Sequence, residues 1–264
     1  CARRRGPRDL SSLGTRGGTA VARRESLIAL GLSTDHLVSV AQGVEGAEGA
    51  EGVQVEPNTA AAFQVLAERA AAEGYDLRIA SAFRGYDRQV RIVNDKWRGL
   101  RSVTDADGRI LERTSQTDIA WLSAILRFSA LPGTSRHHWG TDLDIWDAAA
   151  VSEDYKLSLS PAEYEVGGVF SDMTRWLDER MHADDAEGFF KPYALDRGGV
   201  APEAWHISYR PVARQYQNAE SLETLMSLWR GEPDGLGITH EPLAMLGVIE
   251  PQAASLLARF VDGI

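Results

Sequence analysis

The sequence predicts an α+β fold, in which a small antiparallel sheet is flanked by helices. Segments with helical spacing of apolar residues are interleaved with short segments in which apolar and polar residues alternate. No regular strand–helix–strand rhythm links these segments, which argues against a parallel sheet. At 264 residues, with 44% hydrophobic and 25% charged residues, the chain has the composition of an ordinary globular protein.

The regular elements are predicted from residue 57 onward. Residues 57–75 have the spacing of a helix, with Asn58 or Thr59 as its cap and Gly74 as its stop. Residues 76–83 alternate and then break at a turn, which indicates a strand. Further helices are expected over 86–97, 118–128 and 169–181, further strands over 141–146 and 203–209, and two or three amphipathic helices over 212–261.

The first 55 residues are predicted to be a flexible N-terminal arm and low-complexity linker, followed by one domain over 56–264 with a helical C-terminal tail. The arm holds seven arginines among glycines and small polar residues, and its charge suits either a solvated linker or a tether near an anionic surface. Residues 26–40 are apolar enough for a short helix or a strand, and residues 43–57 are rich in Gly and Glu, as loops are.

The single cysteine, Cys1, stands at the start of the chain. A lipoprotein that has been processed at its cysteine begins in this way. We therefore consider two interpretations: Cys1 carries a lipid that anchors the protein in the cell envelope, or Cys1 is an arbitrary start of the chain. No apolar run approaches the ~18 residues of a membrane span. The net charge of −10 argues against a nucleic-acid partner. We also expect the protein to be a monomer.

Two segments supply residues that typically bind metals. In residues 134–145, His137 precedes a bend at Gly140, and Asp142 and Asp144 share one face of the following strand. In residues 201–209, His206 lies on a short strand, and Glu203 can share its cleft only if the backbone turns near Ala204. Two histidines and one carboxylate with an open position are typical of a catalytic zinc site for one ion, and a free carboxylate such as Glu203 could then act as general base and acid.

A third segment, residues 80–89, places Arg84 at a strand end, where a guanidinium can face a carboxylate or a developing oxyanion. Gln89 follows in the first turn of the next helix. Taken singly, His137 and His206 could equally be core histidines, and Asp144 a capping residue.

Together the segments resemble the zinc D-alanyl-D-alanine carboxypeptidases that include VanY-type and VanX-type enzymes (family M15). The pattern S-x-H-x-x-G-x-x-x-D is matched by Ser135, His137, Gly140 and Asp144. The pattern E-x-W-H is matched by Glu203, Trp205 and His206, and S-x-(Y/F)-R followed by Gln by Ser81, Phe83, Arg84 and Gln89. The resemblance covers about residues 57–212 and implies the fold shared by these peptidases and the hedgehog signalling domain.

The resemblance also implies roles for the matched residues. His137, Asp144 and His206 would bind zinc, Glu203 would be the general base and acid, and Arg84 would contact the substrate or the tetrahedral intermediate. Gln89, Ser135 and Ser81 would help to bind the substrate, a peptidoglycan stem peptide or muropeptide that ends in D-alanine.

Two residues depart from the family pattern or complicate it. Asp142 stands where many members have alanine, and it either holds a ligand imidazole or pairs with a surface arginine. His138 is expected at the rim of the site, because adjacent residues of an extended chain diverge. The remaining histidines, His36, His182 and His240, are expected to be surface or packing residues.

The leading functional hypothesis is a D,D- or L,D-carboxypeptidase of the periplasm or cell envelope. The alternatives are an endopeptidase or D,D-dipeptidase with the same metal site, a cytoplasmic dipeptidase, and a non-catalytic zinc-containing binding module. A carboxypeptidase needs a cleft closed beyond the leaving residue, and residues 100–130 with the helical tail are expected to form that wall.

Overall fold

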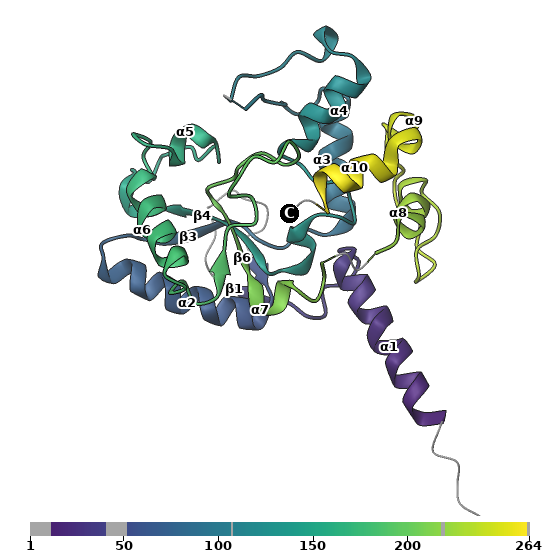
Figure 1. Cartoon of the computed structure of the whole chain (residues 1–264), viewed down its shortest axis with the longest axis horizontal. Helices are drawn as coiled ribbons and strands as arrows, with labels where there is room; N and C mark the ends of the chain where they lie inside the picture. The colour runs from purple at the N-terminus through teal and green to yellow at the C-terminus, as the bar shows by residue number, and fades with distance from the viewer. Residues whose placement is uncertain (1–11, 41–51, 107, 218–219, 263–264) are drawn as a thin grey trace, which may run out of the picture.

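The computed structural model describes residues 12–40, 52–106, 108–217 and 220–262, with the side chains of residues 12–20 left undescribed. Its centre is a four-stranded antiparallel sheet with helices around it, so the predicted α+β fold is confirmed (Figure 1). The strand order is β3–β4–β6–β5, in which β3 spans Leu77–Ser81, β4 Asp142–Asp147, β5 Phe189–Phe190 and β6 His206–Tyr209. No helix in the described part of the chain is long and apolar enough to cross a membrane.

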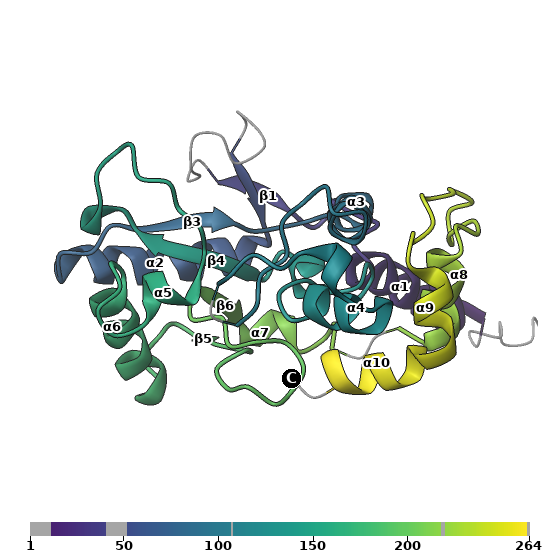
Figure 2. The same ribbon diagram turned by 90° about the horizontal axis from the view of Figure 1, so that it is seen from above.

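One hydrophobic core joins the sheet to two helices, α2 (Pro57–Ala72) and α6 (Ser171–His182). Alternate residues of β3 and β4 supply its centre, since Ile79, Leu143 and Ile145 have no exposed surface. Figure 2 shows α2 running beside β3 and β4. This core fixes β4 and β6, the two strands that carry most of the candidate site.

A second core is built by helices beyond the sheet. It joins α3 (Tyr86–Trp97), α4 (Asp118–Leu126), α8 (Leu222–Trp229), α9 (Leu246–Ile249) and α10 (Ala253–Phe260). Trp229 is fully buried here, and its indole Nε1 donates to the carbonyl of Pro132, 2.8 Å away. The C-terminal helices therefore pack behind α3 and behind the segment that leads to His137.

Short elements complete the chain. The remaining helices are α5 (Pro161–Tyr164) and α7 (Arg210–Ala213), and the 3₁₀ turns are η1 (Arg113–Ser115), η2 (Arg136–Trp139), η3 (Ala148–Ala150) and η4 (Glu250–Gln252). The predicted helices over 57–75, 86–97, 118–128 and 169–181 are present within a few residues of their expected bounds. So are the predicted strands, except that β6 begins at His206 and leaves Glu203 in a turn.

The N-terminal region, predicted as a flexible arm and linker with a short helix or strand over 26–40, contains regular elements in its described part. Helix α1 spans Ser12–Ala29, and β1 (Val38–Val40) pairs with β2 (Val53–Val55). Ile28, Ala29 and Leu30 are buried, because this end of α1 is apolar and packs on the domain while the other end points away (Figure 1). Cys1 and most of the Gly/Glu-rich stretch lie outside the described residues.

The cap of α2 also differs from the prediction. Glu56, rather than Asn58 or Thr59, is the N-cap, and its carboxylate accepts from the Thr59 amide at 2.8 Å. Pro57 explains the shift, since proline has no N–H and its fixed φ suits the first helical position.

Candidate active site

The β4–β6 pairing brings two of the predicted metal ligands together. Asp144 and His206 are direct partners in the antiparallel register, and Asp142 is opposite Ser208 one pair further along. His137 lies in η2, just before β4, and Gly140 closes that turn in the left-handed conformation at φ 70°. The bend expected at Gly140 is therefore present, and it returns His137 to the strand that carries Asp144.

His137, Asp144 and His206 form a group that can hold one metal ion. One atom of each lies within 4.8 Å of the other two, and all three residues are buried. His137 Nε2 is 3.4 Å from Asp144 Oδ2, and His206 Nδ1 is 3.2 Å from Asp144 Oδ1. Residues 62 positions apart, from 144 to 206, thus converge on one point.

Hydrogen bonds orient both imidazoles toward that point. His137 Nδ1 donates to the carbonyl of Ala82 at 2.8 Å, which leaves Nε2 with its lone pair facing Asp144. His206 Nε2 is 2.9 Å from Asp142 Oδ1, so its Nδ1 faces the ligand group. Metal-binding histidines usually have such a partner on their other nitrogen.

Asp142 belongs to a buried polar network. Its carboxylate accepts from Arg136 Nε at 2.7 Å, from Thr141 Oγ1 at 2.7 Å and from Ser208 Oγ at 3.0 Å, besides facing His206. Burial alone would raise the pKa of Asp142, but the Arg136 charge and these hydrogen bonds hold it well below its usual range. Of the two roles considered for Asp142, the structure supports holding the ligand imidazole, because the arginine involved is buried rather than on the surface.

The donor set fits zinc. Asp144 Oδ1 is buried with no hydrogen-bond partner among the described residues, and the two imidazole nitrogens beside this carboxylate, His137 Nε2 and His206 Nδ1, are not the ones that contact Ala82 and Asp142. Two imidazoles and a carboxylate are a common catalytic zinc set, with room for a further ligand.

Glu203 lies beside this group. The amide of His206 donates to the Glu203 carbonyl at 3.1 Å, so the chain turns at Ala204 as the shared cleft requires. Glu203 Oε2 comes within 3.4 Å of His206 Nδ1, and the residue lines the cleft. A carboxylate thus faces the metal group without belonging to it.

Arg84 also lines the cleft, held by its neighbours. Its guanidinium donates to Gln89 Oε1 at 3.2 Å and to Ser81 Oγ at 3.3 Å, while Nε is buried without a partner among the described residues. Gln89 has no exposed surface, and its amide donates to the carbonyl of Ala130. Gln89 therefore positions Arg84, and its contact with substrate stays a prediction.

His138 differs from its predicted place at the rim of the site. It has no exposed surface, so it is not a rim residue. Its Nδ1 donates to the carbonyl of Arg84 at 2.5 Å, and its Nε2 accepts from the Gly133 amide at 3.0 Å. Burial lowers its pKa to about 3, so the ring is neutral, as this bonding pattern requires. His138 fixes the backbone beneath Arg84.

The cleft has a volume of about 540 Å³. Ser135 lies in its wall as predicted, and parts of residues 100–130 line it, whereas no described residue of the tail does. Lys96, Arg136 and Tyr193 are among the lining residues that the sequence interpretation missed. Arg136 adjoins the His137 motif and Tyr193 packs edge-on against the His206 ring, but no local pattern marks Lys96 or Tyr193.

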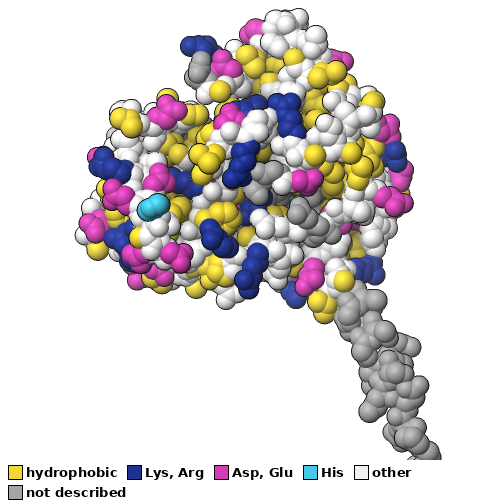
Figure 3. Space-filling model, in the orientation of Figure 1, with side chains coloured by type: hydrophobic (Ala, Val, Ile, Leu, Met, Phe, Trp, Pro, Cys, Tyr) yellow, Lys and Arg dark blue, Asp and Glu magenta, His cyan; other side chains and the backbone are white. Residues whose placement is uncertain are grey.

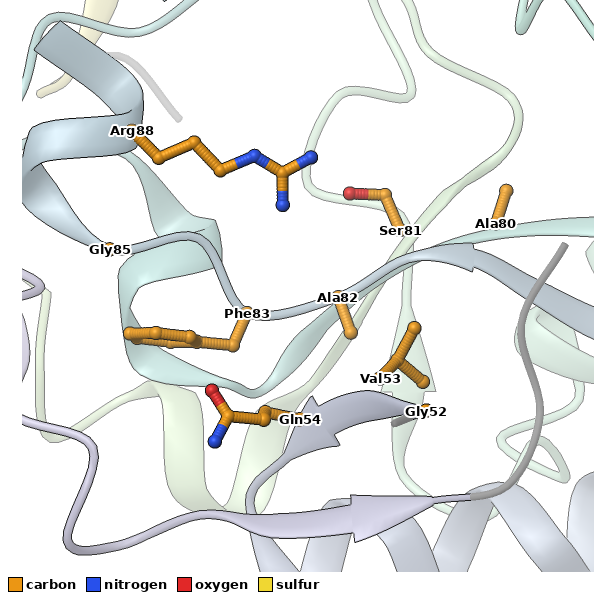
Figure 4. A pocket seen from close by; sticks show the side chains of 9 residues that line it. All are labelled: Gly52, Val53, Gln54, Ala80, Ser81, Ala82, Phe83, Gly85 and Arg88. Carbon is orange, nitrogen blue, oxygen red and sulfur yellow. The ribbon is translucent and has the colours of Figure 1, made fainter. Parts of the chain in front are cut away.

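Ser81 lies on a separate, smaller hollow of about 240 Å³ beside β2 and β3. Figure 4 shows Arg88 reaching over Ser81 on one side and Phe83 with Gln54 on the other. Ser81 also accepts a hydrogen bond from Arg84, which lines the main cleft, and its contact with substrate stays a prediction. Seen from outside, acidic and basic side chains are interspersed over the face in Figure 3.

A buried His/Asp/His group, an adjacent free carboxylate and a guanidinium in one cleft define a metallopeptidase-like centre. The chain belongs to the VanY family of D-alanyl-D-alanine carboxypeptidases, whose family model matches residues 52–212, more than half of the sequence. The predicted family and the predicted class, a hydrolase of peptide bonds, are confirmed.

Two proteins of Haemophilus influenzae (strain ATCC 51907 / DSM 11121 / KW20 / Rd), both described as uncharacterized, are similar in sequence. One is 39% identical over 103 residues, which cover 39% of this chain and 77% of that protein. The other is 44% identical over 70 residues, which cover 26% of this chain and 48% of that protein.

Solved structures with a similar fold include VanYB in complex with D-alanine-D-alanine, at 22% identity and a TM-score of 0.44, covering 68% of this chain and 79% of that one. The LdcB LD-carboxypeptidase is also 22% identical with a TM-score of 0.45, covering 68% and 71%. A mutant of the D,D-pentapeptidase VanY in complex with Zn(II) has 22% identity and a TM-score of 0.45, covering 74% and 92%.

Proposed function

We propose that the chain is a zinc carboxypeptidase that removes the terminal D-alanine from peptidoglycan stem peptides. One zinc ion would be held by His137 Nε2, His206 Nδ1 and the Asp144 carboxylate. The observation that carries the proposal is the Glu203 carboxylate, which lines the cleft beside this group, with Oε2 3.4 Å from His206 Nδ1, and is not one of its three ligands. When bound, the ion would lower the pKa of a water molecule towards about 7 and polarise the scissile carbonyl.

The residues around the ion supply the remaining steps. Glu203 accepts a proton from the attacking water and later returns it to the amine of the departing D-alanine. Arg84 stands where its guanidinium can donate to the oxygen that becomes negative in the tetrahedral intermediate. Asp142 and Ala82 keep the two imidazoles in the orientation that ligation requires.

A peptidoglycan substrate lies outside the cytoplasm, which supports a location in the cell envelope. We propose that location, with lipidation of Cys1 as the means of attachment. Membrane fractionation with metabolic lipid labelling tests it, and a soluble, unlabelled protein in the cytoplasmic fraction contradicts it. The monomeric state stays a prediction, which a measurement of the molar mass in solution by light scattering would check.

Defined muropeptides test the proposed function. Peptides that end in L-Lys–D-Ala, meso-diaminopimelate–D-Ala and D-Ala–D-Ala are incubated with the zinc-loaded protein, and the products are identified by mass. Release of free D-alanine is expected. Cleavage inside a cross-link alone indicates the endopeptidase alternative, and no cleavage of any peptide indicates the binding module.

A further inference from the structure

A lysine in the wall of the cleft is the strongest feature that this mechanism leaves unused. Lys96 lies at the C-terminal end of α3, half-buried, and its side chain lines the same cleft as Arg84 and Glu203. Its ammonium donates to Ser129 Oγ at 2.7 Å. Among the residues that the structure describes, no carboxylate lies within 4.0 Å of this ammonium.

The chain offers a direct comparison. The side chain of Lys191 is 8% exposed and forms an ion pair with Asp178, as a desolvated ammonium normally does. Lys96 loses water in the same way, and its pKa falls to about 8 because burial and the nearby charges of Arg101 and Arg84 disfavour the ammonium more than the charge of Glu203 favours it. A partly desolvated cation inside a cleft, with no carboxylate of the described residues in ion-pair contact, is typical of a binding site for an anion.

The position of Lys96 along the cleft indicates which part of a substrate its ammonium would contact. Arg84 bonds to Gln89, Gln89 bonds to Ala130, and the adjoining Ser129 bonds to Lys96, so the two cations lie along one wall of the cleft. A substrate with its scissile carbonyl at Arg84 extends its leaving residue further along the cleft. The carboxylate that directly follows the scissile bond is one extended residue, about 3.3–3.6 Å, further along the substrate.

We propose that Lys96 binds the free α-carboxylate of the leaving D-amino acid and so makes the enzyme an exopeptidase. This inference rests on the proposed function and deepens it. An ammonium–carboxylate contact favours substrates that end at the residue after the scissile bond. A substrate that continues beyond that residue has an uncharged amide there and leaves Lys96 without a counter-charge.

The test compares one pentapeptide stem ending in D-Ala–D-Ala as the free acid with the same peptide as its C-terminal amide. The wild-type protein should cleave the free acid roughly 10- to 100-fold more efficiently in kcat/KM, the range expected for a hydrogen bond to a charged group. Lys96→Met should lower the rate on the free acid to that on the amide and leave the amide rate unchanged. Lys96→Arg should restore part of the preference, and Lys191→Met, the matched control, should keep all of it.

Binding provides a second readout. In a Glu203→Gln background, calorimetry should show that Lys96→Met weakens binding of D-Ala–D-Ala by a similar factor with zinc content unchanged. Equal losses on acid and amide overturn the inference, because they show a structural role for Lys96. A loss confined to peptides with meso-diaminopimelate, whatever their C-terminus, also overturns it, because the ammonium then binds a side-chain carboxylate.

The two proposals fail in different ways. If the wild-type protein cleaves acid and amide equally well, the Lys96 inference is wrong and the peptidase assignment stands. If it cleaves neither peptide and releases no D-alanine from stems that end in L-Lys–D-Ala or meso-diaminopimelate–D-Ala, the proposed function is wrong; if it cleaves only those stems, the acid–amide comparison is made on them.

Discussion

At the scale of single residues, Glu203 and the metal ligands perform different tasks although they share one cleft. Glu203 Oε2 is nearest to His206 Nδ1, whereas the carboxylate of Asp144 faces both histidines. Because Glu203 is not one of the three metal ligands, we expect that replacing it abolishes proton transfer but leaves the zinc ion bound.

Glu203→Gln should therefore lower kcat by about 100- to 10,000-fold, the usual contribution of a general acid–base group. Zinc content and the urea midpoint should stay unchanged. Turnover of a D-Ala-terminated peptide, measured with elemental analysis of the same samples, checks this. Glu179→Gln on the exposed face of α6 is the control, and full activity of Glu203→Gln would refute the proposed role.

Asp142 acts on the ion through His206. Asp142→Asn replaces a charged acceptor at 2.9 Å from His206 Nε2 with a neutral one and leaves buried Arg136 without its counter-charge. We expect zinc affinity to fall about 10- to 100-fold. Competition with a chromophoric chelator measures this, with the exposed Asp178→Asn as control. Unchanged affinity would assign Asp142 to folding alone.

At the scale of elements, the turn between η2 and β4 decides whether the ligands meet. Gly140 is left-handed, and a Cβ there would clash with Leu37 and come within 3.1 Å of the Glu56 amide. Gly74 is also left-handed, at φ 93°, but a Cβ there would meet nothing within 4 Å. Alanine at Gly74 would therefore cost only the free energy of a left-handed backbone, whereas alanine at Gly140 would also crowd Leu37 and Glu56.

Gly74→Ala should cost about 1–2 kcal/mol of unfolding free energy, the price of a left-handed alanine. Gly140→Ala should cost about 1–3 kcal/mol more, because overpacking is added. Urea denaturation of both variants measures the difference. An equal loss of unfolding free energy in both variants would show that Leu37 and Glu56, which flank β1 and β2, move aside without cost.

Much of this site could be predicted at the element scale, because its signal is local. Alternation put Asp142 and Asp144 on one face of β4, and the motif spacing put His137 before a bend. The β6 partner of Asp144 was identified by its E-x-W-H motif, although strand pairing itself leaves no mark in the sequence.

Other contacts depend on distant packing and could not be predicted. His138 is buried because Gly31, Gly133 and the Arg84 backbone surround it. Lys96 lines the cleft because α3 packs beside Ser129. A short helix or a strand was predicted over residues 26–40, but the arginine-rich composition before them hid the helix α1 that ends in the buried residues Ile28 and Ala29.

At the scale of the whole molecule, the C-terminal helices support the site from behind. Trp229 on α8 is fully buried, bonds to Pro132 and lies in the core that holds α3 and α4. None of the described residues in these helices lines the cleft. Their contribution is the stability of the wall that carries Arg84, Lys96 and the approach to His137.

Trp229→Ala should cost about 3–5 kcal/mol, as expected for removing a large buried aromatic side chain. Leu222→Ala, at a 37% exposed position of the same helix, should change stability by less than about 0.5 kcal/mol. Thermal unfolding measured by calorimetry compares the two. A small effect of Trp229→Ala would mean that the tail is not part of the cooperative domain.

The central claim is that one zinc ion binds between His137, Asp144 and His206. A crystal structure of the zinc-loaded protein, with anomalous data collected on both sides of the zinc edge, tests it most directly. We expect a single strong anomalous peak bonded to His137 Nε2, His206 Nδ1 and the Asp144 carboxylate, with Glu203 nearby but not ligated. Full zinc loading with no peak among these three side chains would contradict it.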